Sequence, residues 1–335
     1  MQPASPLGRT GMQLTRIGLG TWAQGGGGLA YSWGQQDDRE SEAAIRRAVE
    51  TGINWIDTAP AYGRGHAEEV VGRAVASMPE NDRPYVFTKA GRLWDPADPM
   101  GPLRTDVSAA SVRKEVEDSL RRLRTERIDL LQIHWPPTDG TPVEEYWGAV
   151  LRLRDQGKIR AAGLSNHSAE ALEEAEKTGH VDSLQPPFSL IRREAAAAEI
   201  PWCAAHGTGV IVYSPLQAGL LSGAMTAERV AAMPDDDWRG RNPEFTGVQL
   251  GRNLALAERL RPAADRHGVS LAAVAVAWVL AWPGVTGAIV GARRPDQVDG
   301  WEAAAGLRLT GPDLDEIAGA VRETGAGAGP VRPGE

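Results

Sequence analysis

The chain has 335 residues, of which 42% are hydrophobic and 24% charged, and its formal net charge is −8 at pH 7. This composition is typical of a globular protein with a sizeable core and excludes a disordered chain. The acidic balance argues against nucleic acid or an anionic membrane as a partner, and the single cysteine, Cys203, excludes an internal disulfide and a cysteine-built metal site.

The first 18 residues contain no apolar segment of the signal-peptide type, and no run of about 18 apolar residues occurs anywhere in the chain. We therefore expect a cytoplasmic protein that does not span a membrane. The six histidines show no metal-ligand spacing such as HExxH, so no metal is expected.

Eight segments are rich in apolar and β-branched residues and are predicted to form strands. They are residues 16–20, 54–57, 85–89, 128–134, 159–165, 182–185, 209–214 and 286–290. Most are apolar almost throughout, as expected when both faces of a parallel sheet are buried. Helical patterns separate them, for example 109–123, and two such patterns, 251–267 and 270–282, precede the last strand.

Eight strand–helix units predict an α/β fold of the (β/α)8 TIM-barrel type, with a short N-terminal hairpin near 7–16 and extra C-terminal helices. A doubly wound open sheet is the alternative. We expect residues 1–322 to form this single domain and the Gly- and Pro-rich tail 323–335 to be disordered. The long irregular stretch 217–250 is interpreted as a binding loop or lid.

Six of the eight predicted strands end in polar or ionisable residues. These are Asp57, Lys89, His134, Ser165 with Asn166, Gln185, and Tyr213 with Ser214. In a barrel the carboxyl ends of all strands converge on one face, where the active site is built. Polar loops that simply follow strands would explain Ser and Gln, but they explain poorly Lys89, the only lysine on a predicted strand, and His134.

Four residues near this face make chemical sense together. A Tyr phenol with a pKa of about 10 transfers its proton poorly near neutrality. Lys89 could lower the pKa of Tyr62, and Asp57 could keep Lys89 protonated and oriented. His134 could donate to a carbonyl oxygen that becomes an alkoxide during reduction.

With these residues in place, the chain resembles the aldo-keto reductase superfamily, in particular its bacterial NADPH-dependent branch, over nearly its whole length. The matching segments, in family order, are "IGLGTW", "GINWIDTAPAYGRGHAEEVVG", "VFTKAG", "IDLLQIHW", "GKIRAAGLSNHS", "YSPLQAGLLSG" and "IVGARRPDQV". The resemblance implies that Asp57, Tyr62, Lys89 and His134 are a catalytic tetrad with Tyr62 as proton donor.

The resemblance also implies an extended nicotinamide dinucleotide across the barrel mouth. Ser165, Asn166 and Gln185 would hold the nicotinamide carboxamide, and Tyr213 would stack on its ring. Further along the cofactor, the implied contacts are Ser214, Leu216, Gly219, Leu221, Gly291, Arg293 and Gln297. Arg293 would bind the 2′-phosphate of NADPH at a helix start, unless it is merely a solvated surface charge.

Four departures from the family pattern keep NADH possible as the cofactor: Trp301, Ala224, His167 and Phe188. A different dinucleotide motif, G-x-G-x-x-A, is matched by "GLGTWA" at 18–23. It requires a helix to start there, and the "QGGGGLAYSWG" that follows cannot form one, so we reject a Rossmann unit.

The expected partner is a small carbonyl or alcohol compound, with Trp22 and Trp135 as substrate-pocket candidates because each adjoins a motif at the mouth. The predicted activity is NAD(P)H-dependent reduction of aldehydes, ketones or sugar-type carbonyls, or the reverse oxidation, by hydride transfer with Tyr62 as general acid. Two alternatives remain: a cofactor-sensing binding module of reductase fold, and an aldolase or lyase in which Lys89 forms a Schiff base. The oligomeric state and the substrate itself are open.

Overall fold

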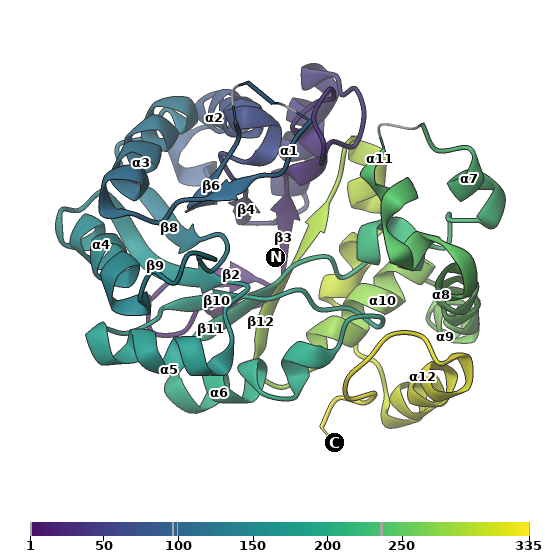
Figure 1. Cartoon of the computed structure of the whole chain (residues 1–335). Helices are drawn as coiled ribbons and strands as arrows, with labels where there is room; N and C mark the ends of the chain where they lie inside the picture. The colour runs from purple at the N-terminus through teal and green to yellow at the C-terminus, as the bar shows by residue number, and fades with distance from the viewer. Residues whose placement is uncertain (1, 96, 99, 235–236, 335) are drawn as a thin grey trace.

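The computed structural model describes residues 2–95, 97–98, 100–234 and 237–334, and its centre is a closed barrel of eight parallel strands (Figure 1). In order around the barrel the strands are β3 (Ile17–Gly20), β4 (Trp55–Asp57), β5 (Tyr85–Ala90), β8 (Ile128–Ile133), β9 (Ile159–Ser165), β10 (Ser183–Gln185), β11 (Gly209–Val212) and β12 (Val285–Gly291). Pairing of β12 with β3 closes the sheet. The predicted (β/α)8 barrel is confirmed, and the open sheet is excluded.

Helices surround the barrel and cover its outer face (Figure 1). They are α1 (Asp38–Glu50), α2 (His66–Ala76), α3 (Ala109–Leu123), α4 (Val143–Asp155), α5 (Ala169–Thr178), α6 (Glu199–His206), α7 (Ala227–Ala231), α8 (Gly247–Arg259), α9 (Arg261–His267), α10 (Leu271–Leu280), α11 (Pro295–Asp299) and α12 (Gly311–Thr324). The helix predicted at 109–123 is α3, capped by the Ser108 side chain. The single helix expected at 251–267 is instead the pair α8 and α9, with Pro262 in the first turn of α9, where its missing N–H interrupts the helix.

All ten residues of α10 are buried, so this helix belongs to the core. Within the described ranges, no single helix combines the length and apolar composition needed to cross a membrane, although Gly247–His267 and Leu271–Leu280, bent by 93°, meet both criteria as a pair.

An N-terminal hairpin closes one end of the barrel. Its antiparallel strands, β1 (Ala4–Pro6) and β2 (Gln13–Thr15), flank a loop whose Leu7 and Met12 are buried. These side chains pack in one cluster with Trp55 and Phe87, which come from inside the barrel. The predicted hairpin is therefore present, beginning three residues earlier than expected.

Packing around Trp55 also explains the first glycine of "GLGTWA", the segment that matches the dinucleotide motif. A Cβ on Gly18 would lie 2.3 Å from the Trp55 ring, so glycine is needed there to admit the indole into the barrel. Gly18 lies within β3, and only a short turn, Trp22–Gln24, follows it rather than a long helix. The rejection of a Rossmann unit holds.

The barrel interior changes from apolar to polar along the strands. Side chains alternate between the two faces of a strand, so residues two apart point the same way. Trp55 and Phe87 belong to the apolar layer next to the hairpin, and two residues later on the same strands come Asp57 and Lys89. The two-residue alternation along β4 and β5 therefore directs apolar side chains into the hairpin end of the barrel and ionisable side chains into the opposite end.

The tail after α12 differs from the expectation of disorder. Ala326 is fully buried, and Ala328 exchanges backbone hydrogen bonds with residues 191 and 193. Gly327 adopts a positive φ of 63° and has no room for a Cβ, which would lie 1.7 Å from the Ile191 oxygen. The glycines of this tail thus permit close packing on the chain after β10.

Candidate active site

A buried ion pair lies at the carboxyl ends of β4 and β5. Lys89 Nζ donates to Asp57 Oδ1 at 2.5 Å and to the Thr58 carbonyl at 3.0 Å. Gln185, at the end of β10, donates to the other carboxylate oxygen at 2.8 Å. The side chains of Lys89 and Asp57 are only 1% and 3% exposed, so each depends on the other for its charge to be compensated.

Tyr62 reaches this pair from the loop after β4. Its hydroxyl lies 3.3 Å from Lys89 Nζ, and the ammonium lies 5.1 Å from the ring centroid. The turn after Tyr62 depends on Gly63, which has φ 62° and whose Cβ would lie 1.9 Å from the Gly25 oxygen. The tight glycine contact between these two loops therefore holds the phenol over the end of β5.

His134 completes the group, following directly after β8. Its ring lies edge-on to that of Tyr62 with centroids 5.8 Å apart. Its backbone is fixed by Asn166, which donates to the His134 carbonyl at 2.9 Å. Burial, with the charges of Lys89 and Arg92, holds the pKa of His134 well below its usual 6.5, so the imidazole is neutral.

Burial dominates the protonation of the other three groups. It raises the pKa of Tyr62 well above 10, and the Asp57 carboxylate adds to this rise. The expectation that Lys89 gives Tyr62 a lowered pKa is wrong for the free protein, because desolvation of the phenolate outweighs the ammonium. Burial also lowers the pKa of Lys89 and raises that of Asp57, and their pairing opposes both shifts. Tyr62 is thus a protonated phenol beside an ammonium.

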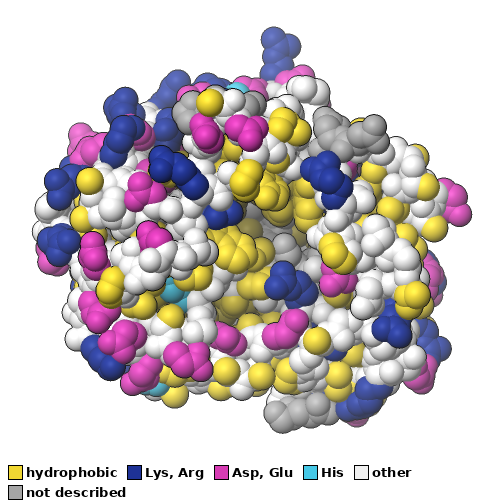
Figure 2. Space-filling view, in the orientation of Figure 1, with side chains coloured by type: hydrophobic (Ala, Val, Ile, Leu, Met, Phe, Trp, Pro, Cys, Tyr) yellow, Lys and Arg dark blue, Asp and Glu magenta, His cyan; other side chains and the backbone are white. Residues whose placement is uncertain are grey.

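These residues open into a cavity of about 350 Å³ at the barrel mouth. Figure 2 shows a hollow at the centre of this face, lined largely by hydrophobic side chains. Tyr62 and His134 line the cavity with both predicted pocket residues, Trp22 and Trp135. The ring of Trp22 stacks at 6.3 Å on that of Tyr62, so it forms a wall next to the phenol.

Ser165, Asn166, Gln185 and Tyr213, the residues predicted to hold the nicotinamide, form one hydrogen-bonded layer in the same cavity. Tyr213 donates to Asn166 Oδ1 at 2.8 Å, and Ser165 donates to the Gln185 carbonyl at 2.9 Å. Asn166 has a φ of 62°, which an L-residue rarely adopts. Donors and acceptors fixed side by side, next to Tyr62, fit a carboxamide group.

The loop after β11 has the backbone shape of an anion site. Ser214, Gln217 and Ala218 all have positive φ although none is glycine, and Gly219 follows at 98°. Such conformations cost about 1–3 kcal/mol each and cluster at functional sites. Left-handed residues in series direct backbone N–H groups into a common concavity, which fits a diphosphate. The predicted contacts Leu216 and Leu221 lie in this loop, Leu221 with its side chain buried.

Arg293, predicted to bind the 2′-phosphate, is already bonded to protein groups. It donates to Gln36 Oε1 at 2.6 Å, to the Trp33 carbonyl at 2.9 Å and to the Gln35 carbonyl. Its backbone N–H donates to Gln297 Oε1 at 2.6 Å. Both residues follow Gly291, the end of β12, so the predicted adenosine-end contacts do lie together, with Arg293 tied to the loop before α1.

Several residues in or beside the cavity were not among the pocket candidates Trp22 and Trp135. Trp238 stacks on Trp22 at 5.1 Å, so this residue of the predicted binding loop lies behind a wall of the cavity. Arg92, three residues after Lys89, also lines the cavity, as do Tyr31 and Trp94. Arg92 could have been found from its place immediately beyond a strand end. The contact of Trp238 with Trp22 could not, because more than 200 residues separate the two in the chain.

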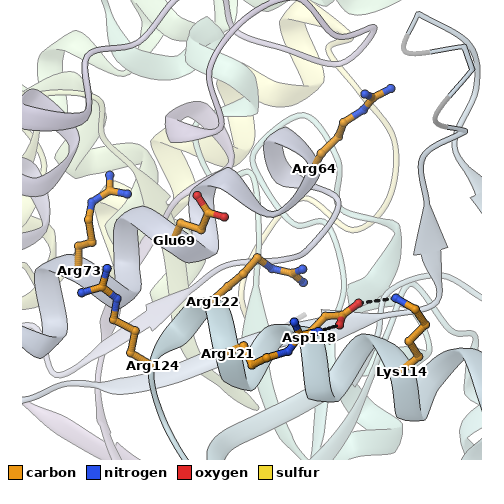
Figure 3. A pocket seen from close by; sticks show the side chains of 8 residues that line it. All are labelled: Arg64, Glu69, Arg73, Lys114, Asp118, Arg121, Arg122 and Arg124. Atoms are coloured by element: carbon orange, nitrogen blue, oxygen red, sulfur yellow. Dashed lines mark hydrogen bonds and ion pairs between the residues drawn. The ribbon is translucent and has the colours of Figure 1, made fainter.

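A second hollow, of about 630 Å³, lies on the outer surface by α2 and α3 (Figure 3). Its lining is charged: Arg64, Glu69, Arg73, Lys114, Asp118, Arg121, Arg122 and Arg124. Much of that charge is paired within the protein, as in the bond of Lys114 to Asp118 at 2.7 Å and of Arg122 to Glu68 at 2.6 Å. None of the four predicted tetrad residues lines this hollow, whereas Tyr62 and His134 line the smaller cavity at the mouth.

Comparison with known proteins shows which family the chain resembles. The model of the Aldo/keto reductase family matches residues 16–322. Aldo-keto reductase YhdN of Bacillus subtilis is 37% identical over 92% of this chain and 90% of its own length. The NADH-specific methylglyoxal reductase of Escherichia coli is 34% identical over 92% of this chain and 95% of its own. The structure of the glycerol dehydrogenase AKR11B4 from Gluconobacter oxydans superposes with a TM-score of 0.87 at 38% identity, covering 99% of this chain and 98% of that one.

Proposed function

The chain belongs to the aldo/keto reductase family, a family of oxidoreductases that act on carbonyl compounds, and from this membership we propose that it is an NAD(P)H-dependent carbonyl reductase or alcohol dehydrogenase with Tyr62 as general acid. The observation that carries the proposal is the cluster of Tyr62, Lys89 and Asp57 in a cavity that His134 also lines.

Ser165, Asn166 and Gln185 would hold the nicotinamide group, which when bound would supply the hydride that the carbonyl carbon takes up. His134, whose ring has no hydrogen-bond partner in the described part of the chain, donates to the carbonyl oxygen and polarises it. Tyr62 gives its proton to that oxygen as the alcohol forms. The Lys89 ammonium beside the hydroxyl stabilises the phenolate left behind, and Asp57 keeps Lys89 charged. In alcohol oxidation each proton moves the opposite way.

The test is the Tyr62→Phe variant. Loss of the proton donor is expected to lower kcat by about 100-fold or more, within the range of general acid catalysis. Nucleotide binding, followed by quenching of tryptophan fluorescence, should be retained because the carboxamide layer is untouched. Wild-type turnover in this variant would overturn the role of Tyr62.

The geometry argues against the Schiff-base alternative. A lysine that attacks a carbonyl must be an unpaired neutral amine, whereas Lys89 is bonded to Asp57, Thr58 and Tyr62. Borohydride added with an aldehyde is expected to trap no adduct on Lys89. The cofactor-sensor alternative predicts nucleotide binding with no carbonyl turnover, so the same assays separate it.

We propose NADPH as the preferred cofactor. Arg293 lies beside the loop before α1 and donates to two backbone carbonyls of that loop. A phosphate that replaced one of these carbonyls would form a stronger hydrogen bond with the guanidinium, because the phosphate is charged. Arg293→Ala should weaken NADPH binding by roughly 10- to 100-fold and NADH binding much less. The matched control is Arg294→Ala, because Arg294 is bonded to Asp296 at the surface. Equal weakening of both nucleotides by Arg293→Ala would show that Arg293 only anchors the loop, and the NADPH preference would be wrong.

A further inference from the structure

Arg92 is the only lysine or arginine among the described residues that line the catalytic cavity. It begins β6 (Arg92–Leu93), directly after the strand that carries Lys89. Its guanidinium carbon lies 5.9 Å from the centroid of the Trp135 ring, the outer wall of the cavity. The positive charge of Arg92 is close enough to His134 to contribute to the low pKa of that imidazole.

Arg92 has no acidic partner in the described part of the chain. Its side chain makes one hydrogen bond, from Nη1 to Thr105 Oγ1 at 3.0 Å. Its Nε is buried and has no hydrogen-bond partner. Only the Tyr31 phenol offsets the loss of hydration that lowers the pKa of Arg92.

Such an arrangement is unfavourable in the free protein. A charge that is partly withdrawn from water is normally compensated by an opposite charge and by a full set of hydrogen bonds. The chain has eight more acidic than basic side chains, yet none of the described residues that line this cavity carries a carboxylate. The guanidinium of Arg92 is therefore able to take an anionic group that enters the cavity.

We propose that Arg92 binds a carboxylate or phosphate on the substrate, so that the preferred substrates are small carbonyl compounds carrying an anionic group. This inference rests on the proposed carbonyl-reductase function. The carbonyl oxygen would lie between Tyr62 and His134, the anionic end at Arg92, and the carbon skeleton against Trp135. Because the cavity of about 350 Å³ must also admit the nicotinamide ring, the substrate is short.

Paired substrates test this directly. We would measure kcat/KM for 4-oxobutanoate against its methyl ester, and for glyceraldehyde 3-phosphate against glyceraldehyde, with either nucleotide. The wild-type protein should favour the anionic member of at least one pair by roughly 10- to 100-fold, the range of a charge-assisted hydrogen bond, mainly through a lower KM. The pair with the larger ratio identifies carboxylate or phosphate as the anion.

In Arg92→Met, which keeps the length of the side chain without its charge, that ratio should fall to near one. Arg92→Lys should retain part of it, because an ammonium keeps the charge but loses the two-pronged geometry. Arg160→Met is the matched control, because Arg160 also lies over an aromatic ring, that of Tyr85, at 5.5 Å. Tyr85 and Arg160 lie near the amino ends of the strands that carry Lys89 and Ser165, away from the cavity, so this variant should leave the ratio unchanged.

A purely structural role for Arg92, in holding β6 to β7 (Arg104–Thr105), predicts another result. Thr105→Val removes the hydrogen bond to Arg92 and would then reproduce Arg92→Met, with equal losses on both members of each pair; that outcome overturns the inference. A test without variants is inhibition of glyceraldehyde reduction by succinate and by inorganic phosphate. Competitive inhibition by either supports the inference, and inhibition by neither contradicts it.

Failure of the inference is distinguishable from failure of the proposed function. Reduction of the neutral aldehydes with no preference for the anionic ones overturns the role of Arg92 alone. Reduction of none of the four compounds, with nucleotide binding intact, overturns the reductase assignment and the inference with it.

Discussion

Substitution of Asp57 by asparagine should separate the charge of the buried pair from its shape. Asparagine has nearly the same volume, but it leaves the Lys89 ammonium without its counter-ion and presents an NH2 group to one of the two donors that now approach the carboxylate. The remaining acceptors for Lys89 Nζ are the Thr58 carbonyl at 3.0 Å and the Tyr62 hydroxyl at 3.3 Å.

The expected loss of folding free energy is about 3–5 kcal/mol, the range measured when one partner of a buried pair is removed. This is a large share of a typical stability of about 5–15 kcal/mol. The pKa of Lys89, already lowered by burial, should fall further without Asp57, because the carboxylate opposes that shift. A neutral Lys89 no longer stabilises the Tyr62 phenolate, so kcat should fall as well.

Urea unfolding of the wild type and Asp57→Asn measures the loss. The control is Glu174→Gln, which breaks the Glu174–Lys177 ion pair. The side chains of this pair are 40% and 63% accessible, so its loss should have little effect on stability. The double variant Asp57→Asn/Lys89→Met removes the unpaired ammonium and should recover part of the loss. A cost near that of the control, or a double variant no better than the sum of the single ones, would refute this account of the pair.

Three further predictions concern the cavity and its support. Trp22→Ala and Trp135→Ala should change KM for a small aldehyde more than kcat, and unchanged kinetics on several aldehydes would remove these rings from the substrate pocket. Because the pKa of His134 lies well below 6.5, kcat/KM should show no ionisation near pH 6.5, and a step there that disappears in His134→Gln would contradict a neutral imidazole. Burial raises the pKa of Glu115 from 4.5 to about 8, so the folded protein retains a proton that the unfolded chain releases. Stability should therefore fall between about pH 4.5 and 8, by a few kcal/mol at most, and Glu115→Gln should flatten this dependence in urea unfolding at several pH values.

The barrel, and the meeting of Asp57 with Lys89 inside it, were predictable from the sequence because both depend on local patterns. Eight apolar segments separated by helical periodicity required burial on both faces, and their boundaries lie within a few residues of β3, β4, β5 and β8–β12. Residues at the carboxyl ends of parallel strands all lie at the same end of the barrel. Asp57 and Lys89 could therefore be brought together before any coordinates.

The net protonation of the site was decided by the tertiary structure. The composition of the tetrad indicates an ammonium that lowers the pKa of Tyr62. Desolvation of the phenol beside the Asp57 carboxylate reverses that sign, and desolvation depends on the assembled barrel. The tail is a similar case, since its glycine content suggests disorder and yet Gly327 permits a contact that no residue with a side chain could make.

What the sequence determined by itself is thus the repeating local order of strand and helix, with polar or ionisable residues at the ends of six of the eight strands. What only the tertiary structure decided are contacts between loops far apart in the chain, such as Trp238 on Trp22, Arg293 on Trp33, and Arg92 without an acidic partner. The reason is physical, because periodicity specifies which face of an element is buried, whereas loop contacts depend on the closure of the whole barrel.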